Sequence, residues 1–282
     1  AWRVESPGML QRAAAGNTGD GLKLYLAYGR GRGQLDVPLT IDAIDPKNGQ
    51  VNRVAQWQSP RADFTHLSVT DGELVYAAFE SKYSIREWRS GAPGHSERMA
   101  TSRTFADLDG DGQTDRVIGR IYGDAVRSEG DLRVEFGNGK VAKIPVAGGV
   151  RSLAVADTKI DAVPTLYFAD GWSASYAKEG RALLKRAEFR DGKFEVTQVV
   201  QSHDEYTFNR VVPVGLPGNE DLLLYGSARV SWVFRDEAGA VGLRPMAGKH
   251  IKAFGELIRD GDRVWMASAG SPSLIEEAPS LR

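Results

Sequence analysis

The chain has 282 residues, 36 Lys and Arg against 37 Asp and Glu, and no Cys. The near-zero net charge argues against a nucleic-acid-binding protein, which normally carries a basic excess. The lack of Cys excludes disulfides, thiolate metal sites and a Cys nucleophile. No run approaches the roughly 18 apolar residues of a membrane span. The length can hold one large β architecture or two ordinary domains.

Short apolar runs with a mostly two-residue period follow one another along the chain. Such runs of about four to eight residues, rich in β-branched and aromatic types, predict β-strands. In chain order they cover residues 22–28, 37–41, 74–79, 85–88, 115–122, 132–136, 141–146, 165–168, 182–189, 194–200, 222–225, 231–234 and 264–267. Only residues 177–187 have some helical character, and Gly180 weakens it. The chain is therefore predicted to be all-β.

Turn signals separate the predicted strands. Asn-Gly and Asp-Gly pairs suit the positive φ angles of tight hairpins. These pairs occur at Asn48-Gly49, Asp71-Gly72, Asn138-Gly139, Asp191-Gly192 and Asp260-Gly261. Many short strands joined in this way are typical of a sandwich, a barrel or a propeller, and internal repetition decides between them.

A repeated unit begins with a short strand, turns through polar residues into a very apolar strand, and ends in a hairpin. Equivalent positions in the opening strands are 39, 48, 57 and 43 residues apart, which brackets the roughly 40–50 residues of a four-stranded blade. The positions taken as equivalent are Thr65, Thr104, Ser152, Asn209 and Lys252.

We therefore predict a single β-propeller over residues 1–282, with four-stranded antiparallel blades. Six blades of about 47 residues are favoured, whereas seven would need about 40 residues each. We expect the N-terminal strand to close the ring by joining the last blade, which would remove the open sheet edges.

The sharpest motif runs from Asp107 to Asp115 with the sequence Asp-Leu-Asp-Gly-Asp-Gly-Gln-Thr-Asp. Its alternating carboxylates place oxygen ligands on one side of a tight loop, and the two glycines let the backbone curl around an ion. Hard oxygen ligands at this density favour Ca²⁺ over transition metals. An EF-hand is excluded, because its twelfth position would be Ile118 where Glu is needed and the flanks have a strand pattern. The predicted ligands are Asp107, Asp109, Asp111, Asp115 and the carbonyl of Gln113.

Residues 105–119 resemble the FG-GAP/VCBS repeat of integrin-like β-propellers. The resemblance implies that calcium sits in the hairpin between the first two strands of a blade, bound by the four Asp residues of the motif. It also implies a protein that is secreted or periplasmic and serves as a structural or binding unit. Corresponding loops elsewhere, at residues 157–161 and 215–221, lack the full pattern, so one calcium site is expected.

A second unusual segment, residues 169–181, interrupts the hairpin pattern with aromatic and charged side chains. Insertions in propellers emerge at the ends of blades, where binding surfaces form. The candidate surface for a glycan or an acidic group comprises Asp170, Trp172, Tyr176, Lys178 and Arg181. The alternative is that the two aromatic residues pack between blades.

No catalytic constellation stands out, since the four His residues are dispersed. We expect a non-catalytic, calcium-stabilised module that binds a protein partner or a glycan, as a scaffold or subunit of an extracellular or envelope assembly. The alternative is a lectin, or a glycan lyase or hydrolase working in the central funnel, which would need Asp170, His203 and Asp204 to share a pocket.

The protein is expected outside the cytoplasm. A loop of short carboxylates without a bidentate Glu predicts the weak calcium affinity of extracellular modules, about 10⁻⁴–10⁻³ M. The chain also begins at Ala1 rather than at an initiator Met, which fits either a removed signal sequence or a cytosolic chain trimmed at its start.

Overall fold

Every described element of the protein is a β-strand. The computed structural model describes residues 7–29, 37–59, 64–81, 84–122, 129–156, 164–171, 182–202, 208, 210–213, 222–225, 230–235, 238, 241–245, 257–260, 263–267 and 275–277. No helix among these residues has the length and hydropathy that crossing a lipid bilayer requires. The prediction of an all-β chain with four-stranded antiparallel sheets is confirmed.

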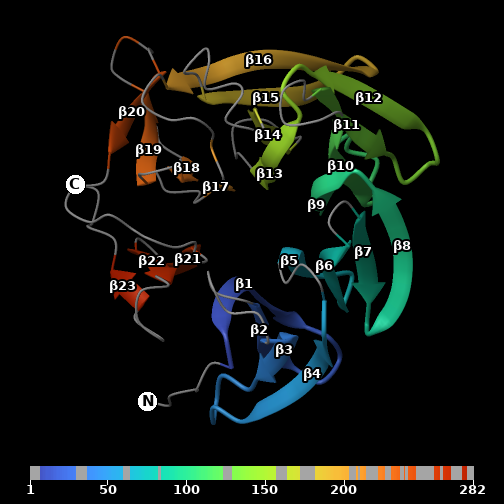
Figure 1. The fold of residues 1–282 in the computed structure, drawn as a ribbon, viewed down its shortest axis with the longest axis vertical. Coiled ribbons are helices and arrows are strands. Elements are labelled where there is room, and N and C mark those ends of the chain that lie inside the picture. The colour runs from blue at the N-terminus through green and yellow to red at the C-terminus, as the bar shows by residue number, and fades with distance from the viewer. Residues whose placement is uncertain are drawn as a thin grey trace. The chain divides into compact units, whose positions relative to one another are not determined.

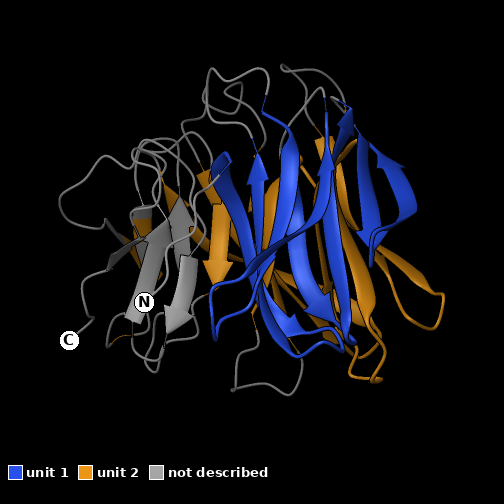
Figure 2. Ribbon diagram, turned by 90° about the horizontal axis from the view of Figure 1, so that it is seen from below, with its two compact units in different colours: residues 1–98, 251–282 blue, residues 99–250 orange. Residues whose placement is uncertain are grey.

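The chain divides into two compact units, residues 1–98 with 251–282 and residues 99–250 (Figure 2). The first unit contains two four-stranded sheets, labelled in Figure 1, and one three-stranded sheet, each in sequential order. Their strands are β1 (Met9–Asn17), β2 (Leu22–Gly29), β3 (Leu39–Ile44) and β4 (Val51–Trp57); β5 (Phe64–Thr70), β6 (Glu73–Ser81), β7 (Ser84–Arg89) and β8 (Ala92–Arg98); and β21 (Leu257–Asp260), β22 (Arg263–Ala267) and β23 (Ile275–Glu277).

The second unit contains three four-stranded sheets of the same order. Their strands are β9 (Ala100–Ala106), β10 (Asp115–Tyr122), β11 (Glu129–Glu135) and β12 (Val141–Val146); β13 (Val150–Ala156), β14 (Thr165–Asp170), β15 (Ala182–Arg190) and β16 (Lys193–Ser202); and β17 (Arg210–Pro213), β18 (Leu222–Tyr225), β19 (Val230–Arg235) and β20 (Val241–Pro245). The first strand β13 lies beside both β9 and β17, so the three sheets meet through their first strands.

A bulge recurs near the start of the first strand of four sheets. The register of the pairing with the second strand skips one residue in each case, namely Gln11, Thr65, Thr101 and Arg151. These bulges locate the repeat better than the sequence comparison, which matched Thr65 but placed the next position at Thr104, three residues too late.

The bulged residue joins one sheet to the next within each unit. In the first unit, the Phe64 amide donates to Gln11 Oε1 at 2.7 Å. In the second, Thr101 Oγ1 donates to the Val150 carbonyl at 2.6 Å. Phe64 and Val150 hold the same place, just before the bulge of their own strand. A bulge can turn a side chain toward a neighbouring element. Here the polar side chain at the bulge forms a hydrogen bond with the main chain of the adjacent sheet.

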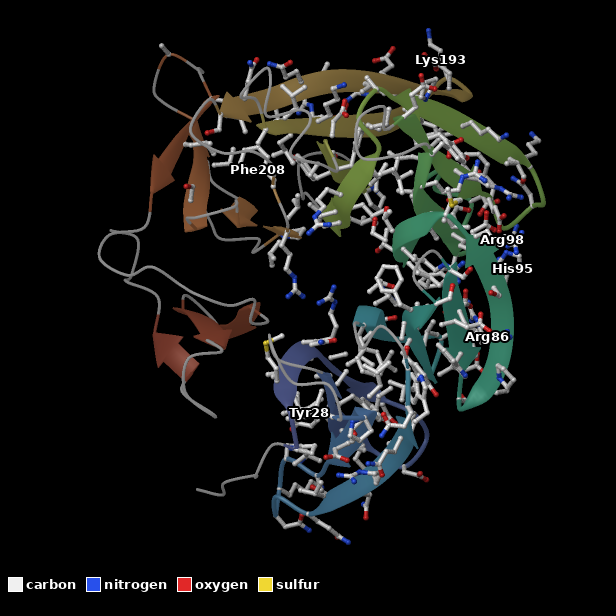
Figure 3. The ribbon with its side chains drawn as sticks, viewed as in Figure 1. Tyr28, Arg86, His95, Arg98, Lys193 and Phe208 are labelled. Atoms are coloured by element: carbon white, nitrogen blue, oxygen red, sulfur yellow. The ribbon has the colours of Figure 1, made fainter. Side chains whose placement is uncertain are left out.

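The cores lie between neighbouring sheets of each unit. In the first unit, the core between β1–β4 and β5–β8 includes Tyr76 and Trp88, whose rings stack with centroids 5.3 Å apart. In the second unit, one core joins β9–β12 to β13–β16, and another joins β13–β16 to β17–β20 and includes Phe208 (Figure 3). Aliphatic and aromatic side chains pointing alternately from each strand build these layers.

Two sequence expectations are settled only in part. Of residues 177–187, those from Ala182 onward belong to strand β15, so the weak helical pattern there is not a helix in the structure. Residues 177–181 lie outside the described part.

The strand β1 pairs with β2 in the first sheet, and residues 1–6 before it are not described. Ring closure by the N-terminus stays a prediction.

Candidate metal centre

The acidic loop connects β9 to β10, the first two strands of a sheet. Asp115 opens β10 and pairs with Ala106, the last residue of β9, so the loop is closed at its base by the antiparallel ladder. Gly110 and Gly112 have φ angles of 75° and 82°. Residues other than Gly rarely adopt this left-handed backbone conformation, which explains why the loop has glycine at these two positions.

Asp107 organises the loop through main-chain hydrogen bonds. Its Oδ1 accepts the Gly110 amide at 2.8 Å and the Asp111 amide at 3.1 Å, and its Oδ2 accepts the Gly112 amide at 2.9 Å. Asp side chains commonly bond nearby main-chain amides, and here the acceptor reaches amides three, four and five residues ahead. The carboxylate therefore lies on the inner side of the turn.

Asp115 is fully buried and joins two loops. Its Oδ2 accepts the Leu108 amide at 2.8 Å, and its Oδ1 accepts the Gly137 amide, in the turn after β11, at 2.9 Å. Burial raises the pKa of Asp115 above its ordinary value. The two amides act in the opposite direction, while the charges of Asp109 and Asp107 raise the pKa further.

Three of the predicted ligands come together. Asp107, Asp109 and Asp115 each offer a carboxylate oxygen, and these three oxygens lie within 4.8 Å of one another. Asp111 is not in this group; its Oδ1 accepts the Gln113 amide at 2.8 Å, and its Oδ2 accepts Gln113 Nε2 at 3.2 Å. These two residues shape the outer part of the loop.

The donor set fits a hard divalent cation such as Ca²⁺. Oxygens on opposite sides of a calcium ion are about 4.6–5.2 Å apart, since each Ca–O bond is about 2.3–2.6 Å. A carboxylate has about four lone-pair positions, so Asp107 with three amide donors and Asp115 with two keep acceptor capacity. Within the described residues, no Lys or Arg forms an ion pair with the three carboxylates.

Sequence reasoning missed the contribution of Gly137. Its amide is bound by Asp115, and its Cα lies so close to Gln113 that an added Cβ would be 2.5 Å from the Gln113 Cβ. The turn signal at residues 137–139 was visible in the sequence, but nothing in it showed that this turn meets the acidic loop.

The second predicted surface is described only at Asp170. This residue ends β14 and is 2% exposed. Its Oδ1 accepts the Gly148 amide at 2.9 Å, and its Oδ2 forms an ion pair with Lys185 of β15 at 2.5 Å. Asp170 is thus buried, and both of its carboxylate oxygens have partners. The other members of the surface, Trp172, Tyr176, Lys178 and Arg181, lie outside the described residues.

The residues that a funnel enzyme would need are also outside the described part, namely His203 and Asp204. Two other histidines have neighbours on their own strands: His66 Nε2 lies 2.8 Å from Ser68 Oγ, and His95 Nε2 lies 2.9 Å from Glu97 Oε2. In the described ranges, the Asp trio is the only group of three or more His, Asp and Glu side chains with metal-binding spacing.

Comparison with known proteins supports the fold alone. No family model and no curated protein matches the chain, so the FG-GAP/VCBS resemblance stays a prediction. Among solved structures, a periplasmic gluconolactonase from Pseudomonas aeruginosa is similar at 16% identity, with a TM-score of 0.51 over 95% of this chain and 88% of that one. Saccharomyces cerevisiae Sqt1 is similar at 12% identity, with a TM-score of 0.52 over 93% of this chain and 72% of that one. Both are β-propeller proteins.

Proposed function

We propose that the chain is a six-bladed β-propeller that binds one Ca²⁺ and acts as a non-catalytic binding or scaffold module. The blade number is supported by the six described sheets, five with four strands and the last with three. The two similar propeller structures, each aligned over more than nine-tenths of this chain, support the architecture.

Asp107, Asp109 and Asp115 would hold the ion. When bound, Ca²⁺ would supply positive charge that offsets the mutual repulsion of the three carboxylates. The chain itself provides the rest of the site, because main-chain amides already orient Asp107 and Asp115. A preoriented set of ligands loses less conformational entropy when the cation binds.

One observation supports a structural role for the carboxylate site over a catalytic one. The carboxylates of Asp107 and Asp115 face the amides of their own loop and of the neighbouring turn. Asp115 is fully buried, and a general acid or base must reach a substrate proton. The site therefore serves to fasten a hairpin, and the binding surface for a protein or a glycan lies elsewhere on the propeller.

The proposed location is outside the cytoplasm, in the periplasm or the surrounding medium. Short Asp ligands without a bidentate Glu predict a calcium dissociation constant of about 10⁻⁴–10⁻³ M, as in extracellular modules. Such a site would be nearly empty at cytosolic calcium concentrations and occupied outside the cell.

Calcium-dependent stability tests the proposal. We expect the melting temperature of the wild-type protein to fall when EGTA removes calcium, and that of Asp109→Ala to be insensitive to calcium. Asp20→Ala is the matched control, because Asp20 is an exposed acid in the loop between the first two strands of another sheet. A melting temperature that is the same with EGTA and with millimolar Ca²⁺ would contradict the calcium site.

The binding role needs its own test. We expect a pull-down from the native envelope, or a glycan array, to yield a ligand that the Asp109→Ala protein still binds at low temperature, since the ion stabilises the fold. A gluconolactonase shares the fold at 16% identity, so lactone hydrolysis is the activity to assay. Turnover of gluconolactone by the purified protein would contradict the non-catalytic proposal.

A further inference from the structure

A cluster of three phenylalanines connects the sheet with the acidic loop to the tip of a hairpin in the next sheet. Phe136 follows β11 and is 7% exposed. Its ring centroid lies 5.0 Å from that of Phe189 and 6.2 Å from that of Phe194. The latter two, 5.0 Å apart, pair across the end of the β15–β16 hairpin, next to its Asp191-Gly192 turn and to Lys193, which opens β16 and is labelled in Figure 3. Residues 189–194 are called the hairpin tip below.

The acidic loop reaches this cluster through Gly137. Asp115 accepts the Gly137 amide at 2.9 Å, and Gln113 packs directly against the Gly137 backbone. Leu108, which follows Asp107, is 1% exposed and belongs to the same hydrophobic core as Phe136. The loop therefore contacts the turn that follows Phe136, and this turn is also closed by hydrogen bonds from the Phe136 amide to the Lys140 carbonyl and from the Gly139 amide to the Phe136 carbonyl, both at 2.9 Å.

Within its own sheet, the hairpin tip is held by the β15–β16 ladder and by the ion pair of Arg190 with Glu188 at 2.8 Å. Phe189 and Phe194 are only partly buried and lie at the margin of the core. Residues 190–193 around the turn are exposed. Aromatic pairs of this geometry are stabilising beyond the area they bury, so the loss of the Phe136 contacts weakens the attachment of the tip to the neighbouring sheet.

We propose that the acidic loop controls the docking of the hairpin tip on the neighbouring sheet. An ordered loop holds Phe136 against Phe189 and Phe194, and a disordered loop releases the tip and uncovers these apolar rings. The link from loop to tip rests on the contacts of Phe136 and Gly137; its control by calcium rests in addition on the proposed function.

Amide hydrogen exchange of the hairpin tip tests the link without any metal. Gly137→Ala keeps every carboxylate but forces a Cβ to 2.5 Å from the Gln113 Cβ, and Phe136→Leu removes the aromatic contacts. Both variants, in EGTA, are expected to accelerate exchange at residues 189–194 about 2- to 10-fold, the range that corresponds to the loss of an aromatic pair. Exchange at the β7–β8 turn, around Ser90, serves as the internal reference.

Val141→Ala is the matched control, because Val141 lies in the same hairpin as Phe136 and its side chain is 51% exposed. We expect exchange of the hairpin tip in this variant to equal that of the wild type. Unchanged exchange of the tip in both Gly137→Ala and Phe136→Leu would overturn the proposal. Should Phe136→Leu fail to fold, Gly137→Ala decides alone.

Calcium addition separates the two proposals. In the wild type, Ca²⁺ is expected to slow exchange at residues 107–115 and at the hairpin tip together, whereas in Gly137→Ala it slows only the loop. Slowing of the loop but not the tip in the wild type would overturn control by the loop and leave the calcium site intact. If neither segment responds, the calcium site is contradicted, and the comparison of variants in EGTA still decides the link.

Discussion

Replacing Asp115 and Asp109 separately by Ala distinguishes two proposed roles of the acidic loop, calcium binding and stabilisation of the calcium-free fold. Asp115 is buried and accepts two main-chain amides at 2.8 and 2.9 Å. Asp109 accepts one amide, from Asp111, at 3.3 Å in the exposed part of the loop. Both belong to the carboxylate trio. We therefore expect both substitutions to remove calcium binding, but only Asp115→Ala to destabilise the calcium-free protein strongly.

The size of each effect follows from the contacts. A buried amide left without an acceptor costs about 1–3 kcal/mol, so the two amides freed in Asp115→Ala cost roughly 2–6 kcal/mol. Part of this is regained because burial and the charges of Asp109 and Asp107 disfavour the Asp115 carboxylate. Asp109→Ala changes the calcium-free stability by about 0.5 kcal/mol or less, as at most surface positions. At 10 mM Ca²⁺ and a dissociation constant of about 0.1–1 mM, binding adds about 1.4–2.7 kcal/mol to the wild type.

Urea denaturation followed by Trp fluorescence measures these free energies in EGTA and in 10 mM Ca²⁺. The expected order in EGTA is wild type equal to Asp109→Ala, with Asp115→Ala well below. In Ca²⁺ only the wild type gains stability. Equal losses for the two variants in EGTA would refute the assignment of Asp115 as a structural acceptor, and a calcium response in Asp109→Ala would refute its role as a ligand.

Three further predictions concern the rest of the fold. Thr101→Val removes the 2.6 Å hydrogen bond to the Val150 carbonyl between sheets and should lower the unfolding free energy by about 1–3 kcal/mol in urea denaturation. Gly16→Ala places a Cβ 2.4 Å from Val69 Cβ and should cost about 1–3 kcal/mol, much of it restored by adding Val69→Ala; no restoration would contradict the clash. Burial raises the pKa of Tyr28, so the unfolded chain loses this proton first and stability falls as pH rises above about 10. Tyr28→Phe should weaken that alkaline loss, which a pH series of melting temperatures measures.

Most inner strands of the fold could be predicted from the sequence, and so could the outer strands β12 and β16, whereas other outer strands could not. Runs such as residues 74–79 are buried on both faces and therefore continuously apolar. The strands β4 and β8 were not predicted, because nearly all their side chains are exposed and carry no apolar alternation. The first strand β1 was missed as well, since Ala and Gly fill much of it and have low β-propensity.

The acidic loop was predictable because its carboxylates lie close together in the sequence, and the errors of the prediction have the same cause. Local spacing identified Asp107, Asp109 and Asp115, but it also included Asp111, which the structure turns toward Gln113. The contact of Asp115 with Gly137 spans 22 residues, and the packing of Phe136 on Phe189 joins different sheets. Long-range contacts of this kind depend on which sheets become neighbours, and local sequence patterns carry no information on that point.

Calcium titration by isothermal calorimetry on the wild type and Asp109→Ala tests the central claim most directly. The wild-type protein, stripped of metal with a chelator and dialysed, is expected to bind one Ca²⁺ per chain with a dissociation constant of about 10⁻⁴–10⁻³ M, and Asp109→Ala is expected to bind none. Retention of wild-type binding by Asp109→Ala, or no binding to the wild type at 10 mM Ca²⁺, would contradict a calcium site formed by Asp107, Asp109 and Asp115.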